Sequence, residues 1–181
     1  MRPHLAPAVL AALAILGGCS DTRPQPAPEV TMSAPNLITV TSPAFGDFDR
    51  IPARYTCDGA DVSPPLAWQD VPPETQALAL ILDDPDAPRG TFVHWVVLDL
   101  PPDTTELPES YSGTSVVQGK NSAGNPSYFG PCPPSGTHHY RFTVYALPAP
   151  TGLNHGASLD QAREAVSLAL AQGRLTGLYS R

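Results

Sequence analysis

Lysine is almost absent from this sequence, since Lys120 is the only one among 181 residues. Lysine and arginine together number 10 against 17 aspartate and glutamate residues, and the formal net charge is −7. The chain therefore has no basic cluster to neutralise a nucleic-acid backbone, and an anionic membrane surface would repel it. We expect no nucleic-acid partner, and any bound anion must be held locally, by a few histidines or backbone amides.

Enzyme motifs are missing as well. The sequence contains no G-x-S-x-G, no P-loop and no convincing nucleophile. No pair of potential ligands has the spacing of a dedicated zinc site. We therefore expect a protein that is not an enzyme and that uses neither a metal nor another cofactor.

The N-terminus has no apolar run long enough to be a convincing transmembrane helix. A charged start is followed by a short apolar stretch, residues 5–16, and then by "LGGC". This order predicts a secretory signal peptide, and the cysteine makes the segment resemble a bacterial lipobox. We expect residues 1–18 to be a lipoprotein signal peptide and Cys19 to carry lipid. The alternative is a plain signal peptide with an incidental cysteine.

Residues 19–36 predict a linker, because "SDTRPQPAPEVTMSAPN" holds four prolines and almost nothing that could pack. Fully extended, it would reach on the order of 50 Å at about 3.1 Å per residue. The remaining residues, 37–181, suffice for one well-cored domain. Ser20, not aspartate, follows Cys19, so the common inner-membrane retention signal is missing. We expect an exported lipoprotein on the periplasmic face, at the outer membrane if the host has one.

Two cysteines are left if Cys19 takes lipid. Cys57 and Cys132 then form an even pair in an exported, oxidising setting, which predicts a disulfide. Cys132 lies in a long loop, residues 119–137, which is dense in glycine, proline, asparagine and serine. Loops of this length are usually functional or disordered, and the prolines of "GPCPPSG" favour a rigid one.

The domain is predicted to be mainly β, because 23 prolines interrupt helices and the apolar runs are short. The one convincing helix begins after Ser158 as N-cap and ends at Gly173, with residues 159, 162, 166, 169 and 170 on one face. The runs at 77–82 and 92–100 are continuously apolar, which suits strands covered on both faces. The expected strands are 37–41, 52–56, 65–68, 76–83, 92–99, 114–118, 138–147 and 175–179.

Because side chains alternate between the two faces of a strand, the sequence predicts which way several polar residues point. His138 and Tyr140 share one face of their strand, about 7 Å apart, whereas His139 faces the other way. By the same alternation His94 shares a face with Phe92, Val96 and Leu98. A histidine in a strand is more often an ordinary core residue than a ligand, so these patterns alone indicate only a possible pocket.

A set of collinear motifs resembles the phosphatidylethanolamine-binding protein family, and most of all its bacterial Raf kinase inhibitor-like branch. The motifs are "DPDAP", "HW" and "GPCPPSGTHHY", joined by "YTCDGADVSPPLAW" (55–68), "GKN" (119–121) and "GLYSR" (177–181). The resemblance covers about residues 37–181. It implies a β-sandwich with a large central sheet, a smaller sheet and a helix near the C-terminus.

The resemblance also implies a small pocket for phosphate-like or carboxylate groups. His94 would form one wall, with Asp84 close enough to fix its tautomer or favour its protonated form. One departure from the family is His139, where arginine is common. The implied ligand-binding residues are Asp84, His94, Pro133, Pro134, His138 and Tyr140, and the implied rim residues are Asp86, Gly130 and Gly136.

The function that this resemblance implies is a non-catalytic binding or inhibitory module. Its partners would be a small anionic ligand, such as phosphate or a phospholipid head group, and an envelope target such as a protease. One alternative is a hydrolase in which His94, His138 and Asp84 act as acid and base. Another is a metal site built from these three residues and His139.

Overall fold

The computed structural model of the chain describes residues 35, 37–113 and 116–181. The predicted signal peptide, Cys19 and all of the predicted linker except Pro35 lie outside the described residues. Within the described part of the chain, no helix has the length and apolar character needed to span a bilayer.

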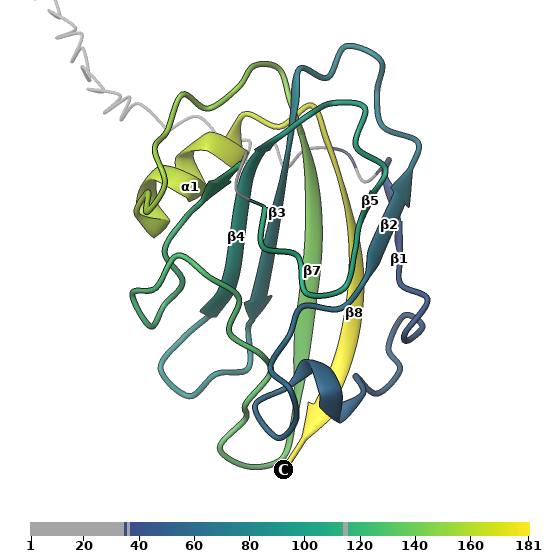
Figure 1. Cartoon of the computed structure of the whole chain (residues 1–181), viewed down its shortest axis with the longest axis vertical. Coiled ribbons are helices and arrows are strands. Elements are labelled where there is room, and N and C mark those ends of the chain that lie inside the picture. Colours follow the sequence, from purple (N-terminus) through teal and green to yellow (C-terminus); the bar gives the residue numbers. More distant parts are fainter. Residues whose placement is uncertain (1–34, 36, 114–115) are drawn as a thin grey trace, which may run out of the picture. The chain divides into compact units, whose positions relative to one another are not determined.

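Two antiparallel sheets make up the domain (Figure 1). The small sheet contains β1 (Thr39–Thr41), β2 (Leu66–Gln69) and β5 (Glu106–Leu107), with β2 between the two edge strands. The large sheet has the order β6-β4-β3-β7-β8, and one helix, α1 (Leu159–Ser167), follows β7. The predicted mainly β sandwich with a C-terminal helix is confirmed. The strands of the large sheet are β3 (Ala77–Asp84), β4 (Phe92–Leu100), β6 (Val117–Gln118), β7 (Thr137–Leu147) and β8 (Ala171–Ser180).

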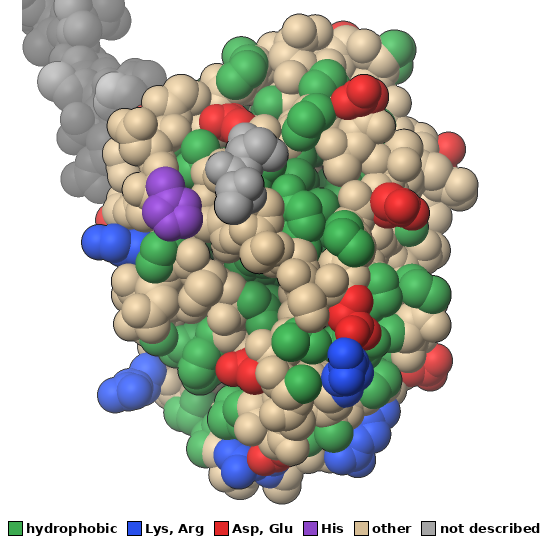
Figure 2. All heavy atoms as spheres, viewed as in Figure 1, with side chains coloured by type: hydrophobic (Ala, Val, Ile, Leu, Met, Phe, Trp, Pro, Cys, Tyr) green, Lys and Arg blue, Asp and Glu red, His purple; other side chains and the backbone are tan. Residues whose placement is uncertain are grey.

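The large sheet is buried on both faces, as the continuous apolar runs predict. One face packs against the small sheet, where Trp68 of β2 meets Trp95 and Phe142 in the main core. The other face packs against α1, where Ala162 meets Ile81 in a second cluster. Most charged side chains stay outside, with the buried Asp84 as an exception. On the face in Figure 2 most of the basic side chains lie in the lower half, mixed with acidic ones.

Two predicted elements differ from the structure. The segment 52–56 is not a strand, because it contains a 3-10 turn, η1 (Ala53–Tyr55), closed by Thr56, whose N–H and hydroxyl both bond the carbonyl of Ala53. The helix has the predicted N-cap, Ser158, in a capping box with Gln161, but it ends at Ser167. The two-residue strand β5 was not predicted.

Gly173, the predicted end of the helix, instead lies inside β8. A Cβ at this position would stand 1.8 Å from the carbonyl oxygen of Ile38. The glycine is therefore needed where the chain before β1 crosses closely over β8. A close approach of this kind has no local sequence pattern, which is why the glycine resembles a helix terminator.

Strand β4 contains two irregularities that break its alternation. Leu82 pairs with Trp95 and Asp83 with Val93, so His94 is an extra residue in a β-bulge. A second register shift is accompanied by the left-handed backbone of Asp99, at φ 59°. The prediction that His94 shares a face with Val96 and Leu98 is therefore wrong, because those two residues pack on the helix side.

Candidate functional site

A cavity of about 370 Å³ opens at the end of the large sheet where β3 ends and where β4 and β7 begin. Four of the six predicted ligand-binding residues line it: Asp84, His94, Pro134 and His138. The other lining residues are Ala87, Pro88, Arg89, Gly90, Phe92, Phe129 and Cys132. The cavity lies at the small end of the range for small-molecule sites, and its walls are mostly apolar, as such sites require.

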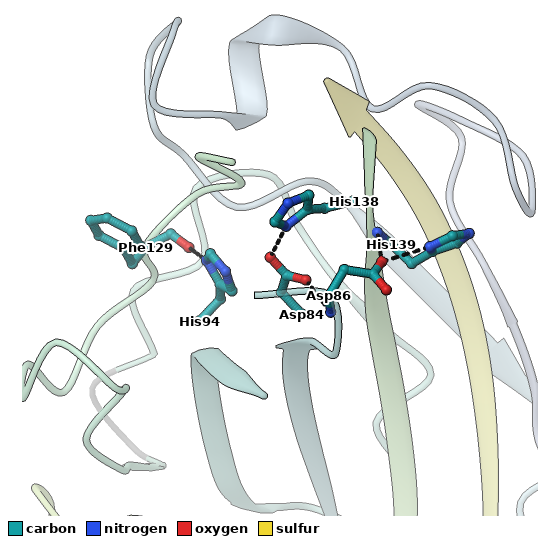
Figure 3. A network of polar contacts seen from close by, with 6 residues as sticks. All are labelled: Asp84, Asp86, His94, Phe129, His138 and His139. Atoms are coloured by element: carbon teal, nitrogen blue, oxygen red, sulfur yellow. Dashed lines mark hydrogen bonds and ion pairs between the residues drawn. The ribbon is translucent and has the colours of Figure 1, made fainter. Parts of the chain in front are cut away.

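Asp84 is hydrogen-bonded to His138 (Figure 3), so it does not fix the tautomer of His94; of the two predicted effects on His94, only the second is found, because the charge of Asp84 favours its protonated form. One carboxylate oxygen of Asp84 accepts a hydrogen bond from Nδ1 of His138 at 2.7 Å, and the other accepts one from the backbone N–H of Asp86 at 2.8 Å. Both side chains of the Asp84–His138 pair are buried. Because the carboxylate holds the proton on Nδ1, the Nε2 of His138 is left for a ligand.

His94 is oriented by the backbone of the long loop. Its Nδ1 donates to the carbonyl of Phe129 at 2.7 Å, and the N–H of Phe129 donates back to the carbonyl of His94 at 3.1 Å. Burial lowers the pKa of His94, and the bond to Phe129 and the charge of Asp84 oppose that shift only in part. The ring is therefore neutral at neutral pH, with a proton on Nδ1 and a lone pair on Nε2.

Tyr140 lies beneath the two histidines and does not line the cavity wall. Its side chain is completely buried, with the ring 5.3 Å from His94 in an edge contact and 6.4 Å from His138 in a stacked one. Burial and the charge of Asp84 raise the pKa of Tyr140, so its hydroxyl stays protonated. Asp84 and the backbone N–H of Cys132 lie close enough to this hydroxyl to influence its pKa, but among the described residues neither forms a hydrogen bond of good geometry with it, which leaves the buried donor unsatisfied.

The long loop is fixed against the rest of the domain, which confirms that it is ordered and carries the predicted disulfide. Cys57 and Cys132 are bonded, and the N–H of Cys57 also donates to Pro131. The N–H of Gly130 donates to the carboxylate of Asp61 at 2.7 Å. A Cβ on Gly130 would stand 2.8 Å from a backbone oxygen, so only glycine permits this approach. The predicted residues Pro133, Gly130 and Gly136 do not line the cavity.

A second histidine–carboxylate pair lies outside the cavity (Figure 3). Asp86 accepts hydrogen bonds from the backbone N–H of His139 at 2.8 Å and from its Nδ1 at 2.7 Å, and these bonds lower the pKa of Asp86. Both side chains are exposed. His139 thus faces away from the cavity, as strand alternation predicts, and Asp86 anchors the turn after β3 to β7.

The structure adds residues that the sequence analysis did not select. Phe92 and Phe129 flank the ring of His94, with centroids 4.8 Å and 5.7 Å from it. Arg89 brings a positive charge to the cavity from the turn between β3 and β4. Its position inside "DPDAPRG" was the available signal. For the metal alternative, no group of three or more suitable ligands occurs within the described ranges.

The fold is a β-sandwich with a cavity of small-molecule size, and sequence comparison places the chain in a family. A sequence model described as "Phosphatidylethanolamine-binding protein" matches residues 41–180, and the chain belongs to this family of binding proteins. The UPF0098 protein of Methanothermobacter thermautotrophicus is 49% identical over 144 residues, covering 76% of this chain and 95% of that protein. A Mycobacterium tuberculosis protein, named as a lipoprotein, LppC, is 40% identical and covers 98% of this chain and 96% of its own.

Solved structures agree with this assignment. A phosphatidylethanolamine-binding protein homologue from Chlamydia trachomatis superposes with a TM-score of 0.75 at 38% identity, covering 81% of this chain and 99% of its own. YbcL of E. coli, described as a member of the mammalian family, gives a TM-score of 0.75 at 29% identity, covering 80% of this chain and 99% of its own.

Proposed function

We propose that this cavity binds a small anionic group, of the phosphate or phospholipid head-group kind, and does not convert it. The observation that carries the proposal is a set of three polar groups with no partner among the described residues. These are Nε2 of His94, Nε2 of His138 and the hydroxyl of Tyr140. Each histidine ring is already fixed through its Nδ1, so the free groups are oriented before a ligand arrives.

An anion is the ligand that best suits these groups. Protonation of either histidine gives an N–H donor with a positive charge at the cavity wall, and Tyr140, buried beneath the two rings, holds a neutral O–H donor that could reach a ligand only if the site adjusts. The carboxylate of Asp84 is buried and already accepts two hydrogen bonds, so it is poorly placed to bind a ligand cation. Nothing at the site favours the hydrolase alternative, because the cavity walls carry no hydroxyl nucleophile and Cys132 is in a disulfide.

The N-terminal predictions extend this proposal to the cell envelope. We propose that residues 1–18 are a signal peptide, that Cys19 is lipidated, and that residues 19–36 tether the binding domain, residues 37–181. The alignment with LppC, a protein named as a lipoprotein, spans 98% of this chain and supports export. In that compartment a lipid-like head group is an available ligand, and an envelope protease or other envelope protein is the kind of target that an inhibitory role would require.

The binding proposal is tested by titration calorimetry with inorganic phosphate and O-phosphoethanolamine. His94→Gln and His138→Gln each remove a ring that can carry charge, and each should weaken binding by about 1.5–3 kcal/mol, the usual worth of a hydrogen bond to a charged group. His139→Gln is the matched control, because its ring lies outside the cavity. Wild-type protein that binds neither compound, or loss of affinity only in His139→Gln, would show that the assignment is wrong.

A further inference from the structure

We propose that Arg89 sets the charge selectivity of this cavity, and that the ligand class is a phosphate monoester with a small apolar or aromatic substituent. The inference rests on the proposed function, since it concerns the same cavity. It adds a residue that neither the family motifs nor the sequence analysis had assigned to ligand binding.

Arg89 is the one arginine among the described residues that has no partner within the protein. Four others form ion pairs: Arg54 with Glu109, Arg141 with Asp83, Arg163 with Asp160 and Arg181 with Asp58. The remaining two are Arg50, over the ring of Tyr179, and Arg174, which donates to Thr143. Arg89 alone is both uncommitted and at the cavity.

The backbone that carries Arg89 is held in place. The N–H of Gly90 donates to the carbonyl of Ala87 at 3.0 Å, which closes a turn with Pro88 and Arg89 at its centre. Proline at the second position of such a turn fixes its φ, and Gly90 adopts a φ of 95° that suits glycine. Asp84 also caps the start of this segment through the N–H of Asp86. One carboxylate thus orients both His138 and the turn that bears Arg89.

If the cavity is to bind an anion, it needs a fixed positive charge such as that of Arg89. Asp84 brings a negative charge to the wall, and His94 is neutral at neutral pH because burial lowers its pKa. Arg89 is the only lysine or arginine that lines the cavity, so it alone offsets Asp84 at every working pH. A planar guanidinium matches two oxygens of a phosphate at once, which favours a doubly charged monoester over a singly charged ligand.

The remaining walls indicate what the phosphate carries. Pro88, Phe92, Phe129 and Pro134 present apolar surface, and the cavity of about 370 Å³ is far larger than a bare phosphate requires. A substituent of the size of a phenyl ring or a short alkyl chain would pack against the rings of Phe92 and Phe129, whose centroids, 5.9 Å apart, place the two rings in contact as one apolar wall. Phenyl phosphate is therefore a suitable probe.

The test is titration calorimetry with phenyl phosphate at neutral pH and at low and high sodium chloride. Arg89→Gln should weaken binding by about 10- to 100-fold and flatten its salt dependence. Arg89→Lys should keep the salt dependence and lose less affinity than Arg89→Gln. Arg163→Gln removes the same charge from α1, outside this cavity, and should bind as the wild type does. Arg89 is exposed, so the thermal unfolding of each variant should be unchanged.

The outcomes separate this inference from the proposed function. If His94→Gln and His138→Gln lose affinity but Arg89→Gln does not, the role of Arg89 is wrong and the binding site stands. Arg89→Lys as weak as Arg89→Gln would show that Arg89 does not act through its charge. Inorganic phosphate binding as tightly as phenyl phosphate would refute the ligand class. No binding of either compound to the wild type would refute both proposals.

Discussion

His94 shows how one residue couples the fold to the site. It is the extra residue of a bulge in β4, and the bulge turns its ring toward the long loop, away from the helix side of the sheet. Bulges next to functional sites commonly re-aim a side chain in this way. The sequence indicated that His94 was important, but its direction depended on a bulge that alternation cannot predict.

The lowered pKa of His94 leads to a prediction for stability. The folded protein keeps this ring neutral to a lower pH than the unfolded chain, in which histidine takes a proton near 6.5. The unfolded state therefore binds more protons in this window, and the free energy of unfolding should fall as pH drops from about 6.5 toward the folded pKa. A tenfold difference in proton affinity between the folded and unfolded states would change the free energy of unfolding by about 1.4 kcal/mol.

Urea unfolding between about pH 7.5 and pH 5 measures this effect. The His94→Gln variant should lose part of the pH dependence, whereas His139→Gln, at an exposed position, should retain it. A saturating phosphate ligand should raise the pKa of His94 and reduce the acid destabilisation. A wild type and His94→Gln with parallel pH profiles would mean that His94 is not held neutral by burial.

At the scale of elements, strand β7 shows which side-chain directions could be predicted from the sequence. Strand β7 follows strict alternation because it has no bulge, so His138 and Tyr140 face the site and His139 faces outward as predicted. The partner of Asp84 could not be predicted, because it depends on how β3 and β7 are paired in space and on a turn that redirects the chain after Asp84. The end of α1 was predicted wrongly because Gly173 does not terminate the helix; it permits the close approach of the Ile38 backbone to β8.

The disulfide provides the prediction at this scale. It links the segment after η1 to the loop that walls the cavity, across a sequence separation of 75 residues. Chain-entropy estimates for a closed loop of this length give about 4 kcal/mol of stabilisation. We expect Cys57→Ser/Cys132→Ser to lower the free energy of unfolding by about that amount and to weaken phosphate binding, because the wall is less firmly held.

Chemical denaturation and calorimetry of the double serine variant, beside the oxidised wild type, provide the measurement. Both thiols of the native oxidised wild type should resist alkylation. Two freely alkylated cysteines, or a double variant with unchanged stability and affinity, would contradict the structural role assigned to this bond.

At the scale of the whole molecule, the proposed site would let an acidic chain bind an anion in a cavity at one end of the large sheet, without a basic surface. The sequence was sufficient to predict the sandwich, the two layers over the large sheet and four of the eleven residues that line the cavity, because short motifs and apolar runs report on them directly. Arg89 was missed because its position follows from the turn geometry, and the two bulges of β4 had no periodic signal.

The proposed anchor gives a prediction for the full chain. Cys19→Ala should release the protein from the membrane fraction or leave an uncleaved precursor, because the acyl chain and the processing site are both lost. Mass spectrometry of the wild type should show an acylated Cys19 as the first residue. Unchanged fractionation of the variant, together with an unmodified native mass, would exclude lipidation.

The central claim is that His94 and His138 offer their Nε2 atoms to one anionic ligand. Long-range nitrogen–proton NMR of the histidine rings tests it most directly, because it reports the protonation of each ring nitrogen. We predict a proton on Nδ1 of both rings in the free protein, and a shift of both Nε2 resonances on addition of phenyl phosphate, with His139 unchanged. Nε2-protonated neutral rings in the free protein, or a ligand-dependent shift confined to His139, would contradict the account.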